Sequence, residues 1–457
     1  MAVSYFGKEG KYVPNHIRIK KIKEGFLITN DYGSWAYLDD EEYKQLRKNE
    51  VKEPLRSLLK EKGILLSEDN MENVIEDYRK KCQYLFQGTS LHIVVPTLRC
   101  NMKCVYCHAN AKPQNAESYD MDKQTAKKTV DFIFQSPSNA ITIEFQGGDS
   151  LLNFDIVKYV VNYAKGLNKT AKKDLRFSLV SNLISLNDEM ADFLMKERIG
   201  LCTSIDGCKI VHDKNRQGHD ETANWIRKIK EKNYRINALL LITKHSLPYH
   251  KEIVNEYVNL GLDTIWVKSL NKLGYAKDNW KEIGLTAEEF LSFWKKSLDY
   301  IVEINKNTLL KENSTVIILR KILKKKGSNF ADLQSPCGAC IAQLAYDYNG
   351  DIYTCDEGRQ FDIFKVGTVD DKYTEILSSN ETKSIVETSI NDNPVCETCA
   401  YKPYCGLCPV CAYSETNNII TKLPDRRCKI LKGQFDYIFE KLIFDENFRK
   451  IFFTWIE

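Results

Sequence analysis

Three cysteines, Cys100, Cys104 and Cys107, are spaced C-x3-C-x2-C and form the tightest group of thiols in the 457-residue chain. Three thiolates at this spacing can bind three irons of a cubane cluster, or three positions of one metal ion. A structural zinc site needs a fourth protein ligand, and His108 follows Cys107 too closely to serve comfortably. A [4Fe–4S] cluster held by three cysteines leaves one iron open to an outside ligand. The spacing therefore favours a cluster with a free coordination position.

A second group of thiols lies toward the carboxyl end of the chain, in a segment rich in loops, glycine and proline. It contains nine of the 15 cysteines, namely Cys337, Cys340, Cys355, Cys396, Cys399, Cys405, Cys408, Cys411 and Cys428. We expect ligated metal to replace a hydrophobic core there. Pairs spaced C-x2-C bind zinc as well as iron–sulfur clusters, so these residues alone leave both metals open.

The composition is that of a globular protein, with 43% hydrophobic and 28% charged residues. A net charge of +4 excludes a chain whose main role is to coat nucleic acid. No apolar run approaches the roughly 18 residues of a membrane span, and the first residues lack the apolar core of a signal peptide. We therefore expect a cytoplasmic protein with no nucleic-acid or membrane partner. An odd number of reduced cysteines argues for metal ligation over disulfides.

The elements that must position the first thiol group form a regular pattern. Six apolar, β-branched runs alternate with helical segments, at 91–98, 140–146, 176–182, 200–206, 236–243 and 264–270. Such alternation predicts an α/β fold with a parallel sheet buried on both faces. An open six-stranded partial barrel and a doubly wound sheet both fit it. In either fold the active site lies at the carboxyl ends of the strands, and Cys100 follows the first strand.

The remaining segments predict two further domains. Residues 1–80 contain strand-like runs followed by two helical stretches, which indicates a compact winged-helix-like module, and a linker helix continues to about residue 90. The parallel-sheet domain is expected over 91–326 and the cysteine-rich domain over 327–457. The amphipathic tail, 431–456, is expected to pack against the core and not against a membrane surface.

The cysteine loop RCNMKCVYCHA resembles the cluster loop of the radical S-adenosylmethionine (SAM) superfamily. Gly147-Gly148-Asp149-Ser150 is similar to the Gly-Gly-Glu-Pro element of that family, in which the backbone and the acidic residue face the amino group of SAM. Ser181-Asn182, SIDG (204–207) and HDKNR (212–216) are similar to later elements. The resemblance implies a partial (β/α)6 barrel, with Asp206 as a pocket residue. It also implies that the SAM contacts are Gly147, Gly148, Asp149, Asn182, Ser204 and Arg216.

The second thiol group resembles a SPASM domain, a loop-rich iron–sulfur domain that holds auxiliary [4Fe–4S] clusters. The resemblance implies two of them. The first would be bound by Cys337, Cys340, Cys355 and Cys408, and the second by Cys396, Cys399, Cys405 and Cys428. Nine cysteines serve eight places, and the spacing leaves open whether Cys340, Cys408 or Cys411 is the spare, with Cys411 as the alternate ligand. Asp356 follows Cys355 directly, as an acidic residue does in sulfatase-maturing relatives, where it is a proposed base.

Nearly the whole chain resembles the radical SAM maturase of the His-Xaa-Ser peptide system, on motifs such as TNDYGSWAYL, SPSNAITIEFQGGDSLLNFD and CAYKPYCGLCP. The resemblance implies reductive cleavage of SAM to a 5′-deoxyadenosyl radical, which takes hydrogen from a leader-bearing precursor peptide. It further implies a flavodoxin- or ferredoxin-type electron donor and a second radical SAM maturase as partners. Two alternatives stay open: a sulfatase-maturase-like enzyme that modifies a folded protein, and a non-catalytic zinc-binding interaction protein.

Overall fold

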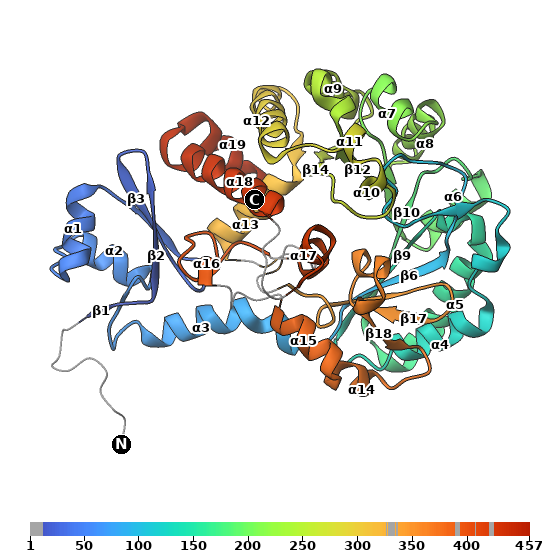
Figure 1. Cartoon of the computed structure of the whole chain (residues 1–457), viewed down its shortest axis with the longest axis horizontal. Coiled ribbons are helices and arrows are strands. Elements are labelled where there is room, and N and C mark those ends of the chain that lie inside the picture. Colours follow the sequence, from blue (N-terminus) through green and yellow to red (C-terminus); the bar gives the residue numbers. More distant parts are fainter. Residues whose placement is uncertain are drawn as a thin grey trace.

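The computed structural model describes residues 12–325, 327, 334, 337–388, 394–406, 408–419 and 425–457. Within these residues, an N-terminal module and a helix lead to a large α/β unit, onto which the cysteine-rich part packs (Figure 1). The first 11 residues of the expected N-terminal domain lie outside the described residues. So does most of the segment 326–336 that contains the expected boundary of the cysteine-rich domain.

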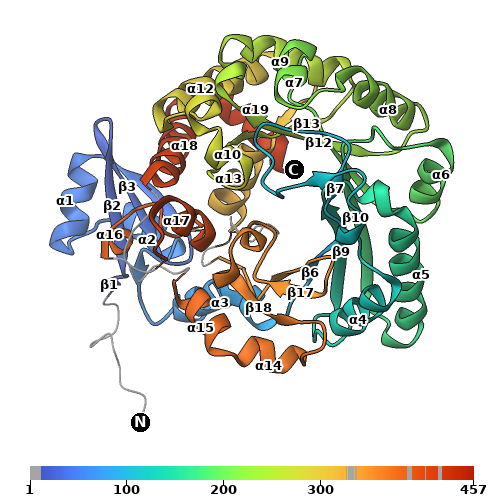
Figure 2. The same cartoon turned by 45° about the vertical axis from the view of Figure 1, so that its right-hand side comes forward.

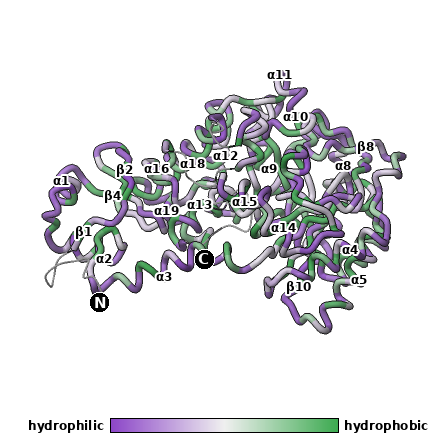
Figure 3. The backbone as a smooth tube through the Cα atoms, turned by 60° about the horizontal axis from the view of Figure 1, so that its bottom comes forward, coloured by the Kyte–Doolittle hydropathy of each residue, from purple (hydrophilic) through white to green (hydrophobic). Residues whose placement is uncertain are grey.

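The N-terminal module is a small antiparallel sheet covered by two helices. Its strands pair in the order β2-β3-β4, where β2 is Ile17–Ile22, β3 is Gly25–Asn30 and β4 is Trp35–Leu38. The helices are α1 (Asp40–Lys48) and α2 (Leu55–Glu61), and a short pair joins β1 (Val13–Pro14) to β5 (Leu65–Leu66). The linker helix α3 (Met71–Cys82) then runs from this module toward the rest of the molecule (Figure 3). The sequence predicts this order of elements, in which strands come first, a pair of helices follows and a linker helix comes last.

Six parallel strands form the centre of the molecule, in the order β14-β12-β11-β10-β9-β6. Their bounds are β6 Leu91–Thr97, β9 Ala140–Gly147, β10 Asp174–Ser181, β11 Gly200–Ser204, β12 Ile236–Ile242 and β14 Val267–Ser269. Because the spatial order follows the chain order, successive right-handed crossovers place their helices on the same side of the sheet. This order excludes the doubly wound alternative and fits the expected partial barrel.

The crossover helices lie in an arc outside the strands (Figure 2). They are α4 Lys123–Ile133, α5 Phe154–Ala171, α6 Asp188–Lys196, α7 Lys209–Asn215, α8 His219–Glu231 and α9 His250–Asn259. Strand β9 shows how the sheet separates its two faces, since successive side chains point to opposite sides. Ile143 and Phe145 are fully buried in the apolar core, whereas Glu144 and Gln146 are partly exposed on the other face. On β9, the inner, concave face is therefore polar.

The cysteine-rich part extends the same sheet. Strand β16 (Gln343–Tyr346) pairs in parallel with β6, and β17 (Asp351–Tyr353) and β18 (Lys365–Thr368) continue the sheet in antiparallel fashion. Side chains of this part, such as Phe364 and Ile376, belong to the same buried apolar cluster as the central strands. The expectation that ligated metal replaces a hydrophobic core here is therefore wrong. These strands have only three or four residues each, too few for a hydrophobic period to reveal them.

The remaining helices surround this core. They are α10 Tyr275–Asp278, α11 Trp280–Ile283, α12 Ala287–Ile304, α13 Asn313–Lys324, α14 Tyr373–Ser378, α15 Asn380–Thr388, α16 Pro394–Glu397, α17 Pro409–Thr416, α18 Asp425–Phe444 and α19 Glu446–Ile456. The amphipathic tail forms α18 and α19, and Phe439 and Phe452 are fully buried, so the predicted core packing is confirmed. Among the helices that the structure describes, none is both long and apolar enough to cross a membrane.

Candidate active site

The loop that carries the first three cysteines lies at the carboxyl end of β6. Cys100 ends the short strand β7 (Arg99–Cys100), which follows β6, and the loop then passes through Cys104 and Cys107. Neighbouring segments fix the loop backbone: Val105 N donates to Asn215 O at 2.9 Å, and Tyr275 N donates to Cys107 O at 2.9 Å. Two segments distant in sequence, at Asn215 and at Tyr275, thus hold the backbone of the cysteine loop in place.

The thiols of this loop are largely protected from solvent and lie within electrostatic range of one another. Burial raises the pKa of Cys100 to about 12 and that of Cys104 to about 11, and Arg216 opposes the shift at Cys104. Buried thiols of this kind stay protonated unless a Lewis acid binds them. A metal centre displaces those protons and forms bonds that compensate for the burial of the thiolates.

Arg216 is the cation of a buried network behind the loop. Its Nη1 donates to Cys104 Sγ at 3.8 Å, its Nε lies 3.2 Å from Asp206 Oδ1, and its guanidinium covers the ring of Tyr106 at 4.9 Å. The Tyr106 hydroxyl donates to the other Asp206 oxygen, as does Asn215 Nδ2 at 3.1 Å. The side chain that the family resemblance suggests as a SAM contact is therefore directed at the cysteine loop.

The two glycines at the end of β9 allow the backbone to pack against the start of the cysteine loop. A side chain at Gly147 would meet Thr97 O at 2.3 Å, and one at Gly148 would meet Arg99 O at 2.1 Å. Gly147 also has a φ of +131°, which disfavours other residues. Glycine is thus required at both positions for steric reasons, because any larger residue would push β9 away from the segment that ends in Cys100.

Asp149 is completely buried and its carboxylate is fully engaged by protein donors. Ser181 Oγ lies 3.0 and 2.9 Å from its two oxygens, Asn182 N donates to it at 3.0 Å, and so does Leu151 N. The aspartate, one methylene shorter than glutamate, reaches the neighbouring strand end. The placement makes Asp149 a support for the segment that carries Asn182.

Asn182 and Ser204 lie at the carboxyl ends of β10 and β11, beside the cysteine loop. The side-chain Nδ2 of Asn182 donates to Asn101 Oδ1 at 2.7 Å and approaches Cys100 Sγ at 3.8 Å. Ser204 is partly exposed at the end of β11. Asn182, Asp149 and Arg216, which are expected to contact SAM, thus each bind other groups of the protein in this structure.

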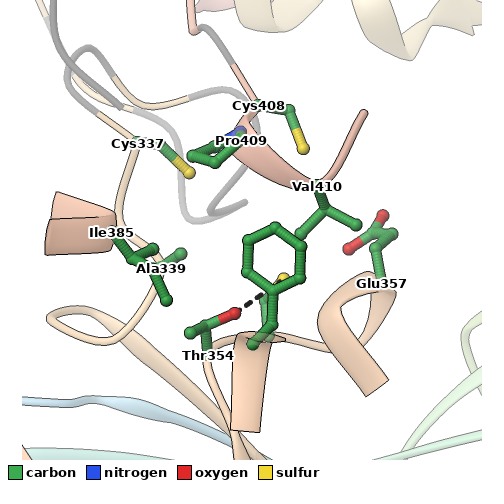
Figure 4. Close-up of a pocket in the computed structure, with 10 residues that line it drawn as sticks. Cys337, Ala339, Thr354, Glu357, Ile385, Cys408, Pro409 and Val410 are labelled. Carbon is green, nitrogen blue, oxygen red and sulfur yellow. Dashed lines mark hydrogen bonds between the residues drawn. The ribbon is translucent and has the colours of Figure 1, made fainter. Parts of the chain in front are cut away.

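The second thiol group divides between two pockets. The first pocket is lined by Cys337, Cys355 and Cys408, together with Glu357 and apolar side chains (Figure 4). Cys340 does not line it: its thiol is fully buried and hydrogen-bonded to Thr382 of α15.

Cys411 lies next to this first pocket, one helical turn after Cys408. Its backbone N donates to Cys408 Sγ at 3.4 Å, and Arg427 Nη1 approaches its own Sγ at 3.9 Å. The neighbourhood of the first pocket therefore contains Cys337, Cys355, Cys408 and Cys411. This set differs from the expected one at Cys340.

All four cysteines expected at the second auxiliary cluster line one pocket, which lies between α16 and α18. They are Cys396, Cys399, Cys405 and Cys428. Lys402, Arg427 and Lys432 line the same pocket, so positive charge surrounds the thiols. Cationic neighbours offset the negative charge of a thiolate-bound cluster.

Within the described residues, no three or more His, Cys, Asp or Glu side chains form a group tight enough for a single metal ion. A zinc ion gathers all its ligands around one point. The sulfurs that bind a cubane cluster are further apart, because each one binds a different iron.

Asp356 connects the two thiol regions through a contact that no sequence motif reveals. Its Oδ2 lies 2.7 Å from Nε2 of His108, the residue after Cys107, and its Oδ1 accepts from Arg359 Nη2 at 3.0 Å. Arg359 also reaches Asp347 at 3.4 Å. Burial raises the pKa of Asp356, but Arg359 and His108 lower it further, so the carboxyl stays below its ordinary pKa and is ionised.

Comparison with known proteins shows what the chain is similar to. Residues 94–257 match the radical SAM superfamily. An uncharacterised protein of Methanocaldococcus jannaschii is 28% identical over 186 residues, which are 40% of the chain and 63% of that protein, so less than two thirds of its length is matched. A cysteine-type anaerobic sulfatase-maturating enzyme of Clostridium novyi is 23% identical, over 70% of the chain and 87% of that enzyme. The radical SAM cyclopropyl synthase TigE of Paramaledivibacter caminithermalis is 22% identical, over 87% of the chain and 83% of its own length.

Two solved structures share the fold. The anaerobic sulfatase-maturating protein anSMEcpe, solved with AdoMet and the Kp18Cys peptide, has a TM-score of 0.67 at 20% identity and covers 78% of the chain and 98% of its own. SuiB of Streptococcus suis, solved with its precursor peptide SuiA, has a TM-score of 0.55 at 16% identity and covers 88% of the chain and 97% of its own.

Proposed function

We propose that the chain, whose residues 94–257 match the radical SAM superfamily, is an enzyme that removes a hydrogen atom from a ribosomally made precursor peptide to install a modification such as a crosslink. The observation that carries the proposal is the three-thiol loop at the carboxyl end of a parallel sheet. Bound there, a [4Fe–4S] cluster and SAM would supply a 5′-deoxyadenosyl radical. The residues of the chain would hold, orient and shield these groups.

Cys100, Cys104 and Cys107 would bind three irons of the cluster. Arg216 would offset the charge of the thiolates through Cys104, because its guanidinium lies 3.8 Å from that sulfur. Gly147 and Gly148 would leave room for SAM and keep β9 close to the loop. Asn182 and Ser204 would contact SAM directly, and Asp149 would hold Asn182 in place. The concave face of the sheet, with Glu144 and Gln146 of β9, would receive the part of the peptide that reacts.

Two auxiliary [4Fe–4S] clusters would lie in the cysteine-rich domain. The pocket that contains Cys396, Cys399, Cys405 and Cys428 supports the second ligand set as expected. For the first cluster we propose Cys337, Cys355 and Cys408, with Cys411 as the fourth ligand in place of Cys340. The arrangement of Cys408 and Cys411 one helical turn apart supports this exchange.

A peptide substrate fits the architecture and the relatives. SuiB was solved with a precursor peptide and anSMEcpe with a peptide, and both cover most of this chain. The N-terminal module would bind the leader by adding it as a strand to a sheet edge. A flavodoxin- or ferredoxin-type donor would supply electrons in the cytoplasm, where thiols stay reduced, and a second radical SAM maturase would be a partner.

A folded protein is the second candidate substrate. The sulfatase-maturating enzyme of C. novyi is similar over 70% of the chain, and it supports this alternative. Modification of a short leader-bearing peptide, but not of a folded sulfatase, would favour the peptide. A colourless protein that contains only zinc would support the binding-protein alternative and end the enzymatic proposal.

The direct test of the radical SAM site is the substitution Cys104→Ala. We expect the variant to lose formation of 5′-deoxyadenosine from SAM under dithionite, because one of the three iron ligands is gone. Cys82→Ala, at the end of the linker helix, is the matched control and should keep the wild-type rate. Unchanged 5′-deoxyadenosine formation by Cys104→Ala would refute the assignment of the loop.

A further inference from the structure

Two acidic side chains, Glu144 of β9 and Asp356 of the cysteine-rich part, repel each other electrostatically. Reactions that follow hydrogen abstraction often release a proton, so one of these carboxylates is expected to receive it. Their surroundings distinguish them, because an acid–base group needs an oxygen that is not held by a fixed cation.

Asp356 is surrounded by cationic and imidazole donors. Arg359 binds Oδ1 through both Nε at 3.1 Å and Nη2 at 3.0 Å, and His108 binds Oδ2 at 2.7 Å. The side chain of Arg359 is only 2% exposed, and it also lies 3.4 Å from Asp347, so two carboxylates share its charge. Asp356, the residue expected to supply the base, is therefore held at both oxygens, by Arg359 of the cysteine-rich part and by His108 of the cysteine loop.

Among the residues that the structure describes, the hydrogen-bond donors to Glu144 are neutral. Gln146 Nε2 donates to Oε1 at 2.5 Å, and Ser178 Oγ donates to Oε2 at 2.9 Å. The titratable groups that face it are Lys268 of β14, Cys202 of β11 and Asp356. Burial raises the pKa of Glu144 above its ordinary value, although Gln146, Ser178 and Lys268 oppose the shift. A carboxylate of this kind can take up a proton without breaking an ion pair.

The position of Glu144 along β9 suits a group that acts on the substrate. It lies three residues before Gly147, which is roughly 10 Å along a strand. Its side chain is on the concave face, whereas its neighbours Ile143 and Phe145 are fully buried on the helix side. A peptide side chain that enters from the carboxyl end of the sheet would pass the cysteine loop first and meet Glu144 below it.

We propose that Glu144 is the general base of the peptide modification, and this inference rests on the function proposed above. Abstraction of a hydrogen atom from a substrate C–H bond leaves a carbon radical. When an X–H group of the peptide closes on that carbon, the C–X bond forms and the X–H bond breaks. One electron leaves to a one-electron acceptor of the iron–sulfur class, and the proton passes to the Glu144 carboxylate. Asp356 acts as a positioning residue, held between Arg359 and His108.

The test compares Glu144→Gln with the wild-type holoenzyme, using the peptide encoded by an adjacent precursor gene. We expect Glu144→Gln to keep its iron content and to form 5′-deoxyadenosine. Modified peptide should fall about 100-fold or more, the usual contribution of a general base. Glu144→Asp should restore part of the product, with the acidic limb of its pH profile displaced. Glu189→Gln, an exposed glutamate of α6, is the matched control and should be normal.

Product at the wild-type rate in Glu144→Gln would overturn the inference. Loss of 5′-deoxyadenosine at full iron content would overturn it as well, because Glu144 would then act before the substrate is deprotonated. Should Glu144→Gln fail to load iron, Glu144→Asp decides: a loaded variant with an unchanged pH profile contradicts the role. A wild-type enzyme that forms no 5′-deoxyadenosine would instead refute the proposed function itself.

Discussion

At the residue scale, Asp206 and Arg216 connect the cysteine loop to the sheet behind it. Asp206 is fully buried just after β11, and its two oxygens accept from Tyr106, Asn215 and the backbone N of Leu241. Its Oδ1 also lies 3.2 Å from Nε of Arg216, with which it forms an ion pair. The carboxylate is therefore the centre of a closed network. Through Arg216 the network reaches Cys104, so the geometry of the thiols depends on a residue that does not touch them.

The substitution Asp206→Asn tests this dependence. It leaves the Arg216 guanidinium buried without a counter-charge, and we expect a loss of about 3–5 kcal/mol in the free energy of unfolding. Iron bound at the three-cysteine loop should also fall, because Arg216 can no longer hold its place beside Cys104. Urea titration and iron analysis measure the two effects. Asp220→Asn, which removes an exposed partner of Lys209, should change neither, and equal behaviour of the two variants would contradict the role of Asp206.

Residue types and spacing predict the thiol groups well, because cluster ligation needs several thiols close together in the chain. They predict side-chain direction poorly. The direction of Asp149 toward Ser181, and of Arg216 toward Cys104, depends on neighbouring strand ends that only folding brings together. The contact between His108 and Asp356 spans 248 positions and has no local signal. Glu144 sits in an ordinary strand pattern, so its chemistry emerges only from its partners.

At the element scale, the joint between β6 and β16 decides how the cysteine-rich part attaches to the parallel sheet. His92 of β6 is fully buried there, with Nδ1 2.8 Å from the Tyr346 hydroxyl of β16 and Nε2 3.1 Å from Thr89 O. Burial, opposed by the Thr89 carbonyl, lowers the pKa of His92 to about 3. The folded protein therefore holds this imidazole neutral at a pH where the unfolded chain binds a proton.

The difference in His92 protonation between the folded and the unfolded chain determines how the stability of the fold changes with pH. Below the ordinary histidine pKa of about 6.5 the unfolded chain takes up a proton at His92 and the folded protein does not, so stability is lost as the pH falls. We expect His92 to contribute a loss of about 2 kcal/mol between pH 6.5 and 5. Urea titrations at both values should show a smaller drop for His92→Gln than for the wild type. An identical drop in the two proteins would show that His92 is not held neutral.

The strands of the sheet differ in how well the sequence predicts them. Five of the six parallel strands have five to eight residues, enough to show their period, and they are predicted with their helices. The sixth, β14, has only three residues and lies within the longer apolar run 264–270. The short strands β16, β17 and β18 are not predicted, since their pairing with β6 is decided by tertiary contact. The same limit explains the wrong expectation that the cysteine-rich part has no hydrophobic core.

At the scale of the whole molecule, the N-terminal module packs directly on the segment of the second auxiliary site. Arg18 Nε of β2 donates to Glu397 O at 2.7 Å, Thr29 Oγ1 donates to Ala400 O at 2.8 Å, and Lys20 Nζ lies 2.6 Å from Asp436. The side chain of Arg18 is 1% exposed. A leader peptide held by the module would therefore lie beside the cysteine-rich part, and its core could extend toward the concave face of the sheet.

The central claim, hydrogen abstraction from a peptide by a SAM-derived radical, is tested most directly by isotope transfer. The reduced, anaerobic holoenzyme is given SAM and the adjacent-gene precursor peptide, with all carbon-bound hydrogens of the peptide replaced by deuterium. Mass spectrometry then reads the 5′-deoxyadenosine that forms. We expect 5′-deoxyadenosine that carries one deuterium, in proportion to the modified peptide. If the peptide is modified but the 5′-deoxyadenosine carries no deuterium, the peptide is not the hydrogen donor, and the central claim is contradicted.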